Sequence, residues 1–216
     1  MVNMRDSKSR AERFVGSSPT SGTNLTRMSD KEALAYVIGL AIGDGNLSNP
    51  NGRAVRLRIT CDTKYPNLIK NAVSGIRQIL PKNKVSLVTR NDKCLDVSCY
   101  SNKWENLLGW KAKLGSKYLQ QVTVPTWIFE SKKYEIYCLK GLFETDGSVY
   151  SDRGYLTVNF VNIIKPLTIQ VQKMVIDLGF SSNTQVFKQE FRKDKYTLRI
   201  SKNASAFINL VGINKT

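Results

Sequence analysis

Histidine is absent from the 216-residue sequence, and this absence excludes several kinds of active site. Without an imidazole there is no serine–histidine or cysteine–histidine triad, no histidine-ligated zinc and no nuclease with a histidine general base. The four cysteines form no C-x-x-C pair, which argues against a zinc cluster and against a secreted disulfide framework. We therefore expect a protein of a reducing compartment.

Long apolar runs and acidic residues are also scarce. The longest apolar stretch, residues 36–42, is far too short to span a bilayer, and the polar N-terminus has no signal-peptide pattern. These features predict an intracellular protein without a membrane partner. Only 17 acidic residues oppose 33 basic ones, which leaves a net charge of +16.

The basic excess lies mainly outside the N-terminal segment. Residues 31–121 carry a net charge of +9 and residues 122–216 carry +5, against +2 for residues 1–30. A basic folded body indicates a polyanionic partner, first of all nucleic acid. The alternative is a basic surface that serves only solubility. Residues 1–29 are rich in Ser, Thr, Arg and Asn without a sustained apolar period, so we predict a flexible basic tail there.

The rest of the chain reads as two copies of one α+β unit, offset by about one hundred residues. In the first copy, residues 30–121, a capping box at Ser29–Glu32 starts a helix that ends near Gly45. Alternating and periodic segments then predict a strand, a helix, two strands and a short helix at 53–61, 65–80, 85–89, 94–100 and 104–114. The second copy, residues 122–216, repeats this order with helices at 134–145, 166–178 and 204–210 and strands at 155–161, 184–191 and 196–201.

Each copy contains one distinctive string that ends in Asp-Gly. The strings are Gly39–Gly45 (GLAIGDG) and Gly141–Gly147 (GLFETDG). Small residues four positions apart lie on one helix face, so two such helices can approach closely; they are Gly39 with Gly43 and Gly141 with Thr145. Asp44 and Asp146 then fall at equivalent ends of a helix pair.

Two carboxylates at adjacent helix C-termini are costly, because the helix dipole is already negative there. The arrangement is explained if Asp44 and Asp146 bind a divalent cation, since Mg²⁺ prefers hard oxygen ligands. Such a metal would activate a water and stabilise the leaving oxygen of a phosphodiester. The alternative is that Asp-Gly is merely a helix-ending turn. Two motifs in register with the repeat make this alternative the weaker one.

The two strings resemble the motifs of the LAGLIDADG homing endonucleases in their single-chain, two-motif form. The resemblance covers roughly residues 31–216 in element order and spacing. It implies two pseudo-symmetric αββαββα halves, with the motif helices at the central interface and two antiparallel sheets forming a DNA-binding saddle. It also implies a monomer that cuts both strands of a long, nearly asymmetric site, leaves 3′ overhangs and resides with the genome that carries its gene.

The resemblance also implies a set of site residues. Asp44 and Asp146 would bind Mg²⁺, for which we expect Mn²⁺ to substitute, and the backbone carbonyls of Gly43 and Thr145 would assist. The first motif has Ile42 where the family often has an acid.

Two lysines compete for the role of stabilising charge on the phosphate. Lys117 resembles a recurrent family lysine, and Lys64 directly follows the first alternating strand. For each, the alternative is a solvated or phosphate-positioning lysine.

The outward faces of the predicted strands supply candidate DNA contacts, because a two-stranded ribbon fits the major groove and Arg reads guanine there. The alternative is a polar face that serves solubility alone. The candidates in strands and nearby loops are Arg53, Arg56, Arg58, Thr60, Arg90, Ser98, Tyr100, Tyr155, Thr157, Asn159, Gln185, Gln189, Arg192, Lys195 and Arg199.

Two other functions would use the same scaffold. One is a group I intron maturase, whose partner would be the RNA of its own intron, and the other is a regulator that binds DNA without cutting. Neither function needs two costly helix-end acids, so Asp44 and Asp146 favour the nuclease.

Overall fold

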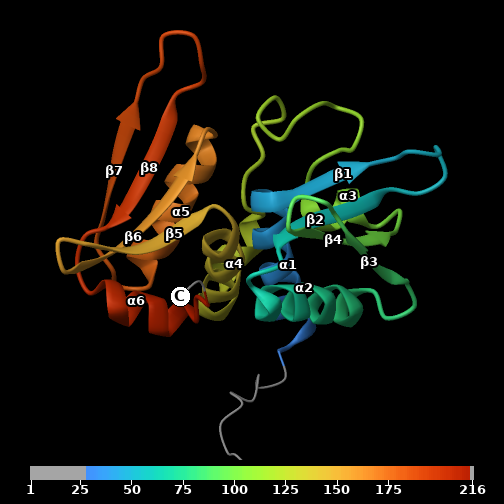
Figure 1. The fold of residues 1–216 in the computed structure, drawn as a ribbon, viewed down its shortest axis with the longest axis horizontal. Coiled ribbons are helices and arrows are strands. Elements are labelled where there is room, and N and C mark those ends of the chain that lie inside the picture. Colours follow the sequence, from blue (N-terminus) through green and yellow to red (C-terminus); the bar gives the residue numbers. More distant parts are fainter. Residues whose placement is uncertain (1–27, 215–216) are drawn as a thin grey trace, which may run out of the picture.

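Two helix–sheet units follow one another along the chain, on either side of a central pair of helices (Figure 1). The computed structural model describes residues 28–214. The predicted tail at residues 1–29 therefore lies almost entirely outside the described residues. Helix α1 begins as predicted, because Ser29 and Glu32 form the capping box with both of its reciprocal hydrogen bonds.

The first unit has the element order αββαββα. Its elements are α1 (Asp30–Asp44), β1 (Gly45–Ser48), β2 (Arg56–Asp62), α2 (Pro66–Ile79), β3 (Val85–Thr89), β4 (Cys94–Tyr100) and α3 (Trp104–Leu108). The predicted short helix at 104–114 is shorter than expected because Gly109 ends it in a left-handed conformation. Strand β1 was not predicted from the residue pattern.

The second unit repeats the order after a 3-10 turn at Thr126–Glu130. Its elements are α4 (Lys132–Thr145), β5 (Gly147–Asp152), β6 (Tyr155–Asn162), α5 (Lys165–Asp177), β7 (Ser182–Phe187), β8 (Lys195–Ile200) and α6 (Ala204–Val211). The predicted α+β class with two αββαββα halves is confirmed. Among residues 28–214, no helix is both long and apolar enough to cross a membrane.

Each unit contains one antiparallel four-stranded sheet, with strand orders β1-β2-β4-β3 and β5-β6-β8-β7. Side chains alternate across each sheet. In β2, Leu57, Ile59 and Cys61 are buried in the core, and the intervening polar residues face the other way. Helix α2 lies against the first sheet, and α5 and α6 lie against the second. One face of each sheet thus stays available for a partner.

Helices α1 and α4 form the central interface, as the small residues of the two motif strings predicted. A Cβ on Gly39 would lie 2.2 Å from the carbonyl oxygen of Cys138, and one on Gly141 would lie 2.4 Å from that of Tyr36. Only glycine therefore permits this backbone-to-backbone contact.

A buried polar network ties the same helices together. The Tyr36 hydroxyl donates to Glu144 Oε2 at 2.7 Å, and Lys140 Nζ lies 2.9 Å from Glu144 Oε1. Lys140 also donates to the carbonyl of Gly212, the residue that ends α6. Glu144 thus serves a structural role within the motif helix, and the network links α1, α4 and α6.

Glu135 on α4 is a buried carboxyl group next to Asp177, the last residue of α5. Its side chain is only 3% exposed, and burial together with the Asp177 charge raises its pKa to about 7. The folded chain therefore holds a proton on Glu135 that an unfolded chain would release above its ordinary pKa of about 4.5. This contribution to stability is complete below that ordinary pKa and is lost as the pH rises to about 7.

At pH 8 the buried Glu135 carboxyl of the wild type is forced to ionise at a cost in free energy, whereas a glutamine amide stays neutral. We therefore expect Glu135→Gln to raise the free energy of unfolding at pH 8 by about 2 kcal/mol relative to wild type. Urea unfolding at pH 5 and pH 8 measures this. Glu130→Gln, which alters an exposed acid just before α4, is the matched control and should leave the pH dependence unchanged. An identical pH dependence in wild type and Glu135→Gln would contradict the expectation.

Candidate active site

The two motif acids emerge side by side from the ends of α1 and α4. Asp44 is the last residue of α1, and Asp146 caps the C-terminus of α4. The residues that precede them are in contact, because a Cβ on Gly43 would lie only 1.9 Å from Thr145 Oγ1. Strands β1 and β5 start directly after the acids, so each acid stands where a motif helix turns into a sheet. Asp44 is exposed and Asp146 is half-buried.

Lys117, from the segment that joins the two units, places its ammonium at the C-terminal end of α1. Lys117 Nζ donates to the carbonyls of Ala41, Ile42 and Gly43, with a distance of 3.2 Å to the Ala41 oxygen. The helix end leaves the carbonyls of Ile42 and Gly43 without intrahelical partners, whereas the Ala41 carbonyl also accepts from the backbone N–H of Gly45. A cation at this end complements the helix dipole. Burial holds the pKa of this ammonium below its ordinary value, and the charges of Asp146 and Asp44 offset that lowering only in part. Lys117 therefore offsets part of the cost of placing two acids at helix ends.

Asn162 holds the second acid. Its Nδ2 donates to Asp146 Oδ2 at 2.8 Å, and the backbone N–H of Val161 donates to the Asp146 carbonyl at 3.4 Å. Asn162 ends β6, sixteen positions from Asp146 along the chain. This contact could not be predicted from the sequence, because only the β5–β6 pairing brings the two residues together.

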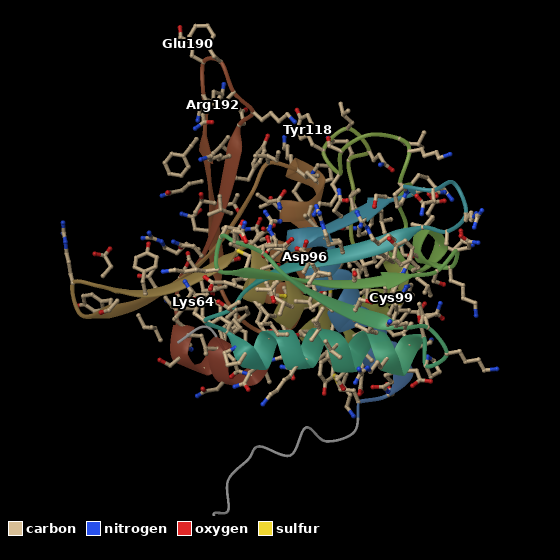
Figure 2. The ribbon with its side chains drawn as sticks, turned by 45° about the vertical axis from the view of Figure 1, so that its right-hand side comes forward. Lys64, Asp96, Cys99, Tyr118, Glu190 and Arg192 are labelled. Atoms are coloured by element: carbon tan, nitrogen blue, oxygen red, sulfur yellow. The ribbon has the colours of Figure 1, made fainter. Side chains whose placement is uncertain are left out.

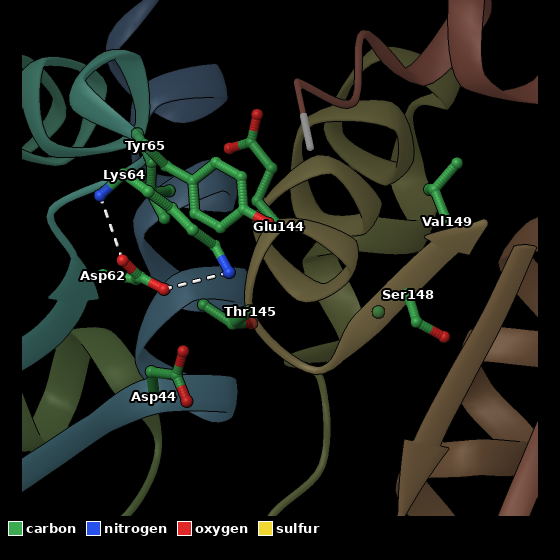
Figure 3. A pocket seen from close by; sticks show the side chains of 10 residues that line it. Asp44, Asp62, Lys64, Tyr65, Glu144, Thr145, Ser148 and Val149 are labelled. Carbon is green, nitrogen blue, oxygen red and sulfur yellow. Dashed lines mark hydrogen bonds and ion pairs between the residues drawn. The ribbon is translucent and has the colours of Figure 1, made fainter. Parts of the chain in front are cut away.

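A cavity of about 330 Å³ opens beside the acids, between the ends of α1 and β2 and the α4–β5 corner. Figure 3 shows Asp44, Lys64 and Thr145 on its wall. Lys64 Nζ lies 3.1 Å from Asp62 Oδ2 and 4.8 Å from the centre of the Tyr65 ring, with 63% of its side chain exposed. Lys64 thus lies near the first acid on an open wall, whereas Lys117 is half-buried and interacts electrostatically with both acids.

The donor set at the helix ends suits a hard divalent cation. Asp44 and Asp146 offer carboxylate oxygens, as Mg²⁺ prefers. Among residues 28–214, no group of three or more His, Cys, Asp or Glu side chains is placed to hold a metal ion. A cation here would therefore need further oxygens from a phosphate and from water. The Gly43 carbonyl, a predicted ligand, already accepts from Lys117 and has one further lone pair to offer. The Thr145 hydroxyl donates back to its own helix, to the carbonyl of Gly141 at 2.9 Å.

Comparison with known proteins agrees with this geometry. A family model described as a LAGLIDADG-like domain matches residues 133–212. The solved structure "The crystal structure of I-DmoI in complex with DNA and Mn" aligns with a TM-score of 0.63 and 21% identity over 87% of this chain and 100% of that chain. Residues 133–212 thus match the LAGLIDADG-like domain, and the chain as a whole shares its fold with I-DmoI.

Two further structures share the LAGLIDADG fold with this chain. One describes mesophilic variants of the homing endonuclease I-DmoI, with a TM-score of 0.61 and 21% identity over 84% of this chain and 96% of that one. The other is full-length DUF199/WhiA from Thermatoga maritima, with a TM-score of 0.61 and 14% identity over 89% of this chain and 59% of that one. No curated protein matches the sequence.

In the first half of the LAGLIDADG fold, the predicted DNA-facing residues share one face of the first sheet. Register places Arg56 opposite Tyr100, Arg58 opposite Ser98 and Thr60 opposite Asp96. Tyr100 is 43% exposed, whereas Ser98 is only 9% exposed and lies beneath its neighbours. Arg53 and Arg90 are exposed in the loops at the two ends of the sheet.

In the second half the predicted face is also shared, but two of its members are covered. Thr157 and Asn159 are 8% and 7% exposed, whereas Tyr155 is 78% exposed. Asn159 lies between two larger side chains: Arg199 Nε donates to its Oδ1 at 3.1 Å, and its Nδ2 donates to the Tyr150 hydroxyl at 3.0 Å. The alternation of residues within β6 does not predict this burial, because the covering side chains come from the neighbouring strands. Leu156, an apolar residue of β6, is nevertheless 40% exposed near the tip of the β5–β6 hairpin.

The β7–β8 hairpin projects from the body and carries the remaining candidates (Figure 2). Gln185 lies on β7, Lys195 begins β8, and Gln189 and Arg192 lie in the loop between the strands. The linker between the two halves supports this loop, because Lys193 Nζ lies 3.7 Å from the centre of the Tyr118 ring.

Proposed function

We propose that the chain is a site-specific, divalent-metal-dependent double-strand DNA endonuclease that acts as a monomer. The observation that carries this proposal is the meeting of Asp44 and Asp146 at the ends of two touching helices, between two sheets with polar outer faces. The likeness to I-DmoI, a homing endonuclease solved with DNA and Mn, supports it. We further propose that the chain works inside the cell, with the genome that carries its gene.

The roles of the residues follow from their positions. Asp44 and Asp146 would hold Mg²⁺ or Mn²⁺ against the backbone phosphate of each strand. A metal bound there would lower the pKa of a bound water and stabilise the leaving oxygen of the phosphodiester. Asn162 orients the Asp146 carboxylate, and Lys117 supplies a fixed positive charge close to both acids. The net charge of +16 supports binding to the DNA backbone.

A DNA-binding protein without nuclease activity is the second candidate, because the WhiA structure has the same fold at 14% identity. An RNA maturase is the third. Both would use the polar sheet faces without needing a metal. The two helix-end acids, with Lys117 and Asn162 in contact with the motif ends, favour cleavage over either.

A cleavage assay separates the three functions. The substrate is the DNA that flanks the gene, joined without its intron, and it is incubated with the full chain and Mg²⁺. We expect a cut in both strands with a 3′ overhang, and none with EDTA. Specific binding of this duplex without a cut, in Mg²⁺ and in Mn²⁺, would identify a regulator. Preference for the intron RNA would identify a maturase.

A further inference from the structure

An acidic side chain, Asp96, lies in the middle of the first sheet on the face proposed to bind DNA (Figure 2). It belongs to the central strand β4, directly opposite Thr60 of β2. The residue is only 8% exposed. A carboxylate at this place repels phosphate, so its presence calls for a local reason.

Three side chains converge on this carboxylate. The Thr60 hydroxyl donates to Asp96 Oδ1 at 2.8 Å. A terminal nitrogen of Arg58 lies 3.8 Å from Oδ2, and one of Arg90 lies 3.8 Å from Oδ1. The latter two distances exceed those of hydrogen bonds, so both arginines are attracted to Asp96 without being hydrogen-bonded to it. Arg90 is also held within its own turn, where its Nη2 donates to Asp92 Oδ2 at 2.8 Å. The terminal nitrogens that face Asp96 can still bind another acceptor.

Asp96 is the carboxylate that the two arginines share. Their guanidinium groups approach the same carboxylate from β2 and from the β3–β4 turn, and without a negative charge between them they would repel each other. An arginine reads guanine through a bidentate contact that requires a defined orientation of its planar group.

We propose that Asp96 is a positioning residue that holds Arg58 and Arg90 as a pair, so that they read two guanines in the major groove. The proposal rests on the proposed function, since it requires that this sheet face binds DNA.

The second sheet has no equivalent pair. In the second sheet, the pair equivalent to Thr60 and Asp96 is Val161 and Thr197, and neither side chain carries a charge. There a single arginine, Arg199, is held instead by the neutral Asn159. The two halves are therefore expected to read different bases, as an asymmetric target requires.

The test is a selection of bound duplexes from a randomised library, with Ca²⁺ in place of Mg²⁺, for wild type and Asp96→Asn. The amide keeps the shape and can still accept from Thr60, but it loses the charge. We expect the preference for guanine to fall about tenfold at two positions, while affinity for random duplex rises. Asp152→Asn, which removes an exposed acid from β5, is the control: affinity for random duplex should rise with an unchanged sequence preference.

Two single variants test the same point without altering Asp96. Arg58→Lys and Arg90→Lys should each lose the guanine preference at one of the two positions that Asp96→Asn affects. An unchanged guanine preference in Asp96→Asn would overturn this inference but not the proposed function. Loss of a preference for cytosine at one position would also overturn it, because that result would mark Asp96 as a direct base contact. A wild-type chain that selects no sequence would contradict the proposed function and the inference with it.

Discussion

Asp146→Asn is expected to abolish double-strand cleavage, with a loss of about a thousandfold or more, while DNA binding persists. The amide keeps its size and can still accept from Asn162, which donates to Asp146 Oδ2 in the wild type. It lacks the charge that a divalent cation needs. Asp44→Asn should have the same effect, because the two acids end touching helices. Cleavage of a supercoiled plasmid with the target site, followed over time in Mg²⁺, measures both variants.

The control must separate the charge at the helix ends from charge in general. Asp152→Asn serves here too, since it removes an acid from the same unit at the far end of β5. It should cleave at close to the wild-type rate. If either motif variant cut both strands as fast as wild type, the assignment of the acids would be wrong. Loss of DNA binding in both variants would point to a folding role instead.

The parts of this molecule that the sequence alone predicted are those set by local periodicity. The capping box at Ser29, the strands β3 and β4, and the contact between the motif helices depend on spacing within short segments. Strand β1 escaped prediction because it has four residues with one apolar side chain, Leu47, well buried among them, and it is extended through its pairing with β2.

The rest of the candidate site depends on contacts between distant segments. Asn162 reaches Asp146 only when β6 pairs with β5, and Asp96 meets Arg58 only across the β2–β4 ladder. A single sequence gives no sign of such pairings. Burial of Asn159 has the same origin, since Tyr150 and Arg199 cover it from the two neighbouring strands.

Lys117→Met is expected to reduce cleavage about a hundredfold and to destabilise the fold by about 2 kcal/mol. The stability loss follows from the carbonyls of Ile42 and Gly43 at the end of α1, which would lose their half-buried donor, and from that of Ala41, which would keep only the N–H of Gly45. The cleavage loss follows from the missing positive charge beside Asp44 and Asp146. Urea unfolding and a cleavage time course on the same preparations measure the two effects separately.

Lys64→Met is the matched control for Lys117→Met, because Lys64 is exposed and pairs with Asp62 on the cavity wall. It should leave stability unchanged, since an exposed ion pair contributes little. If Lys64→Met lost cleavage and Lys117→Met kept the wild-type rate per folded molecule, Lys64 would be the catalytic lysine and Lys117 only a helix cap. If Lys117→Met lost cleavage and Lys64→Met kept the wild-type rate, Lys117 would be both the catalytic lysine and the helix cap. We expect this second result, because the Lys117 ammonium contacts the motif helix that carries Asp44.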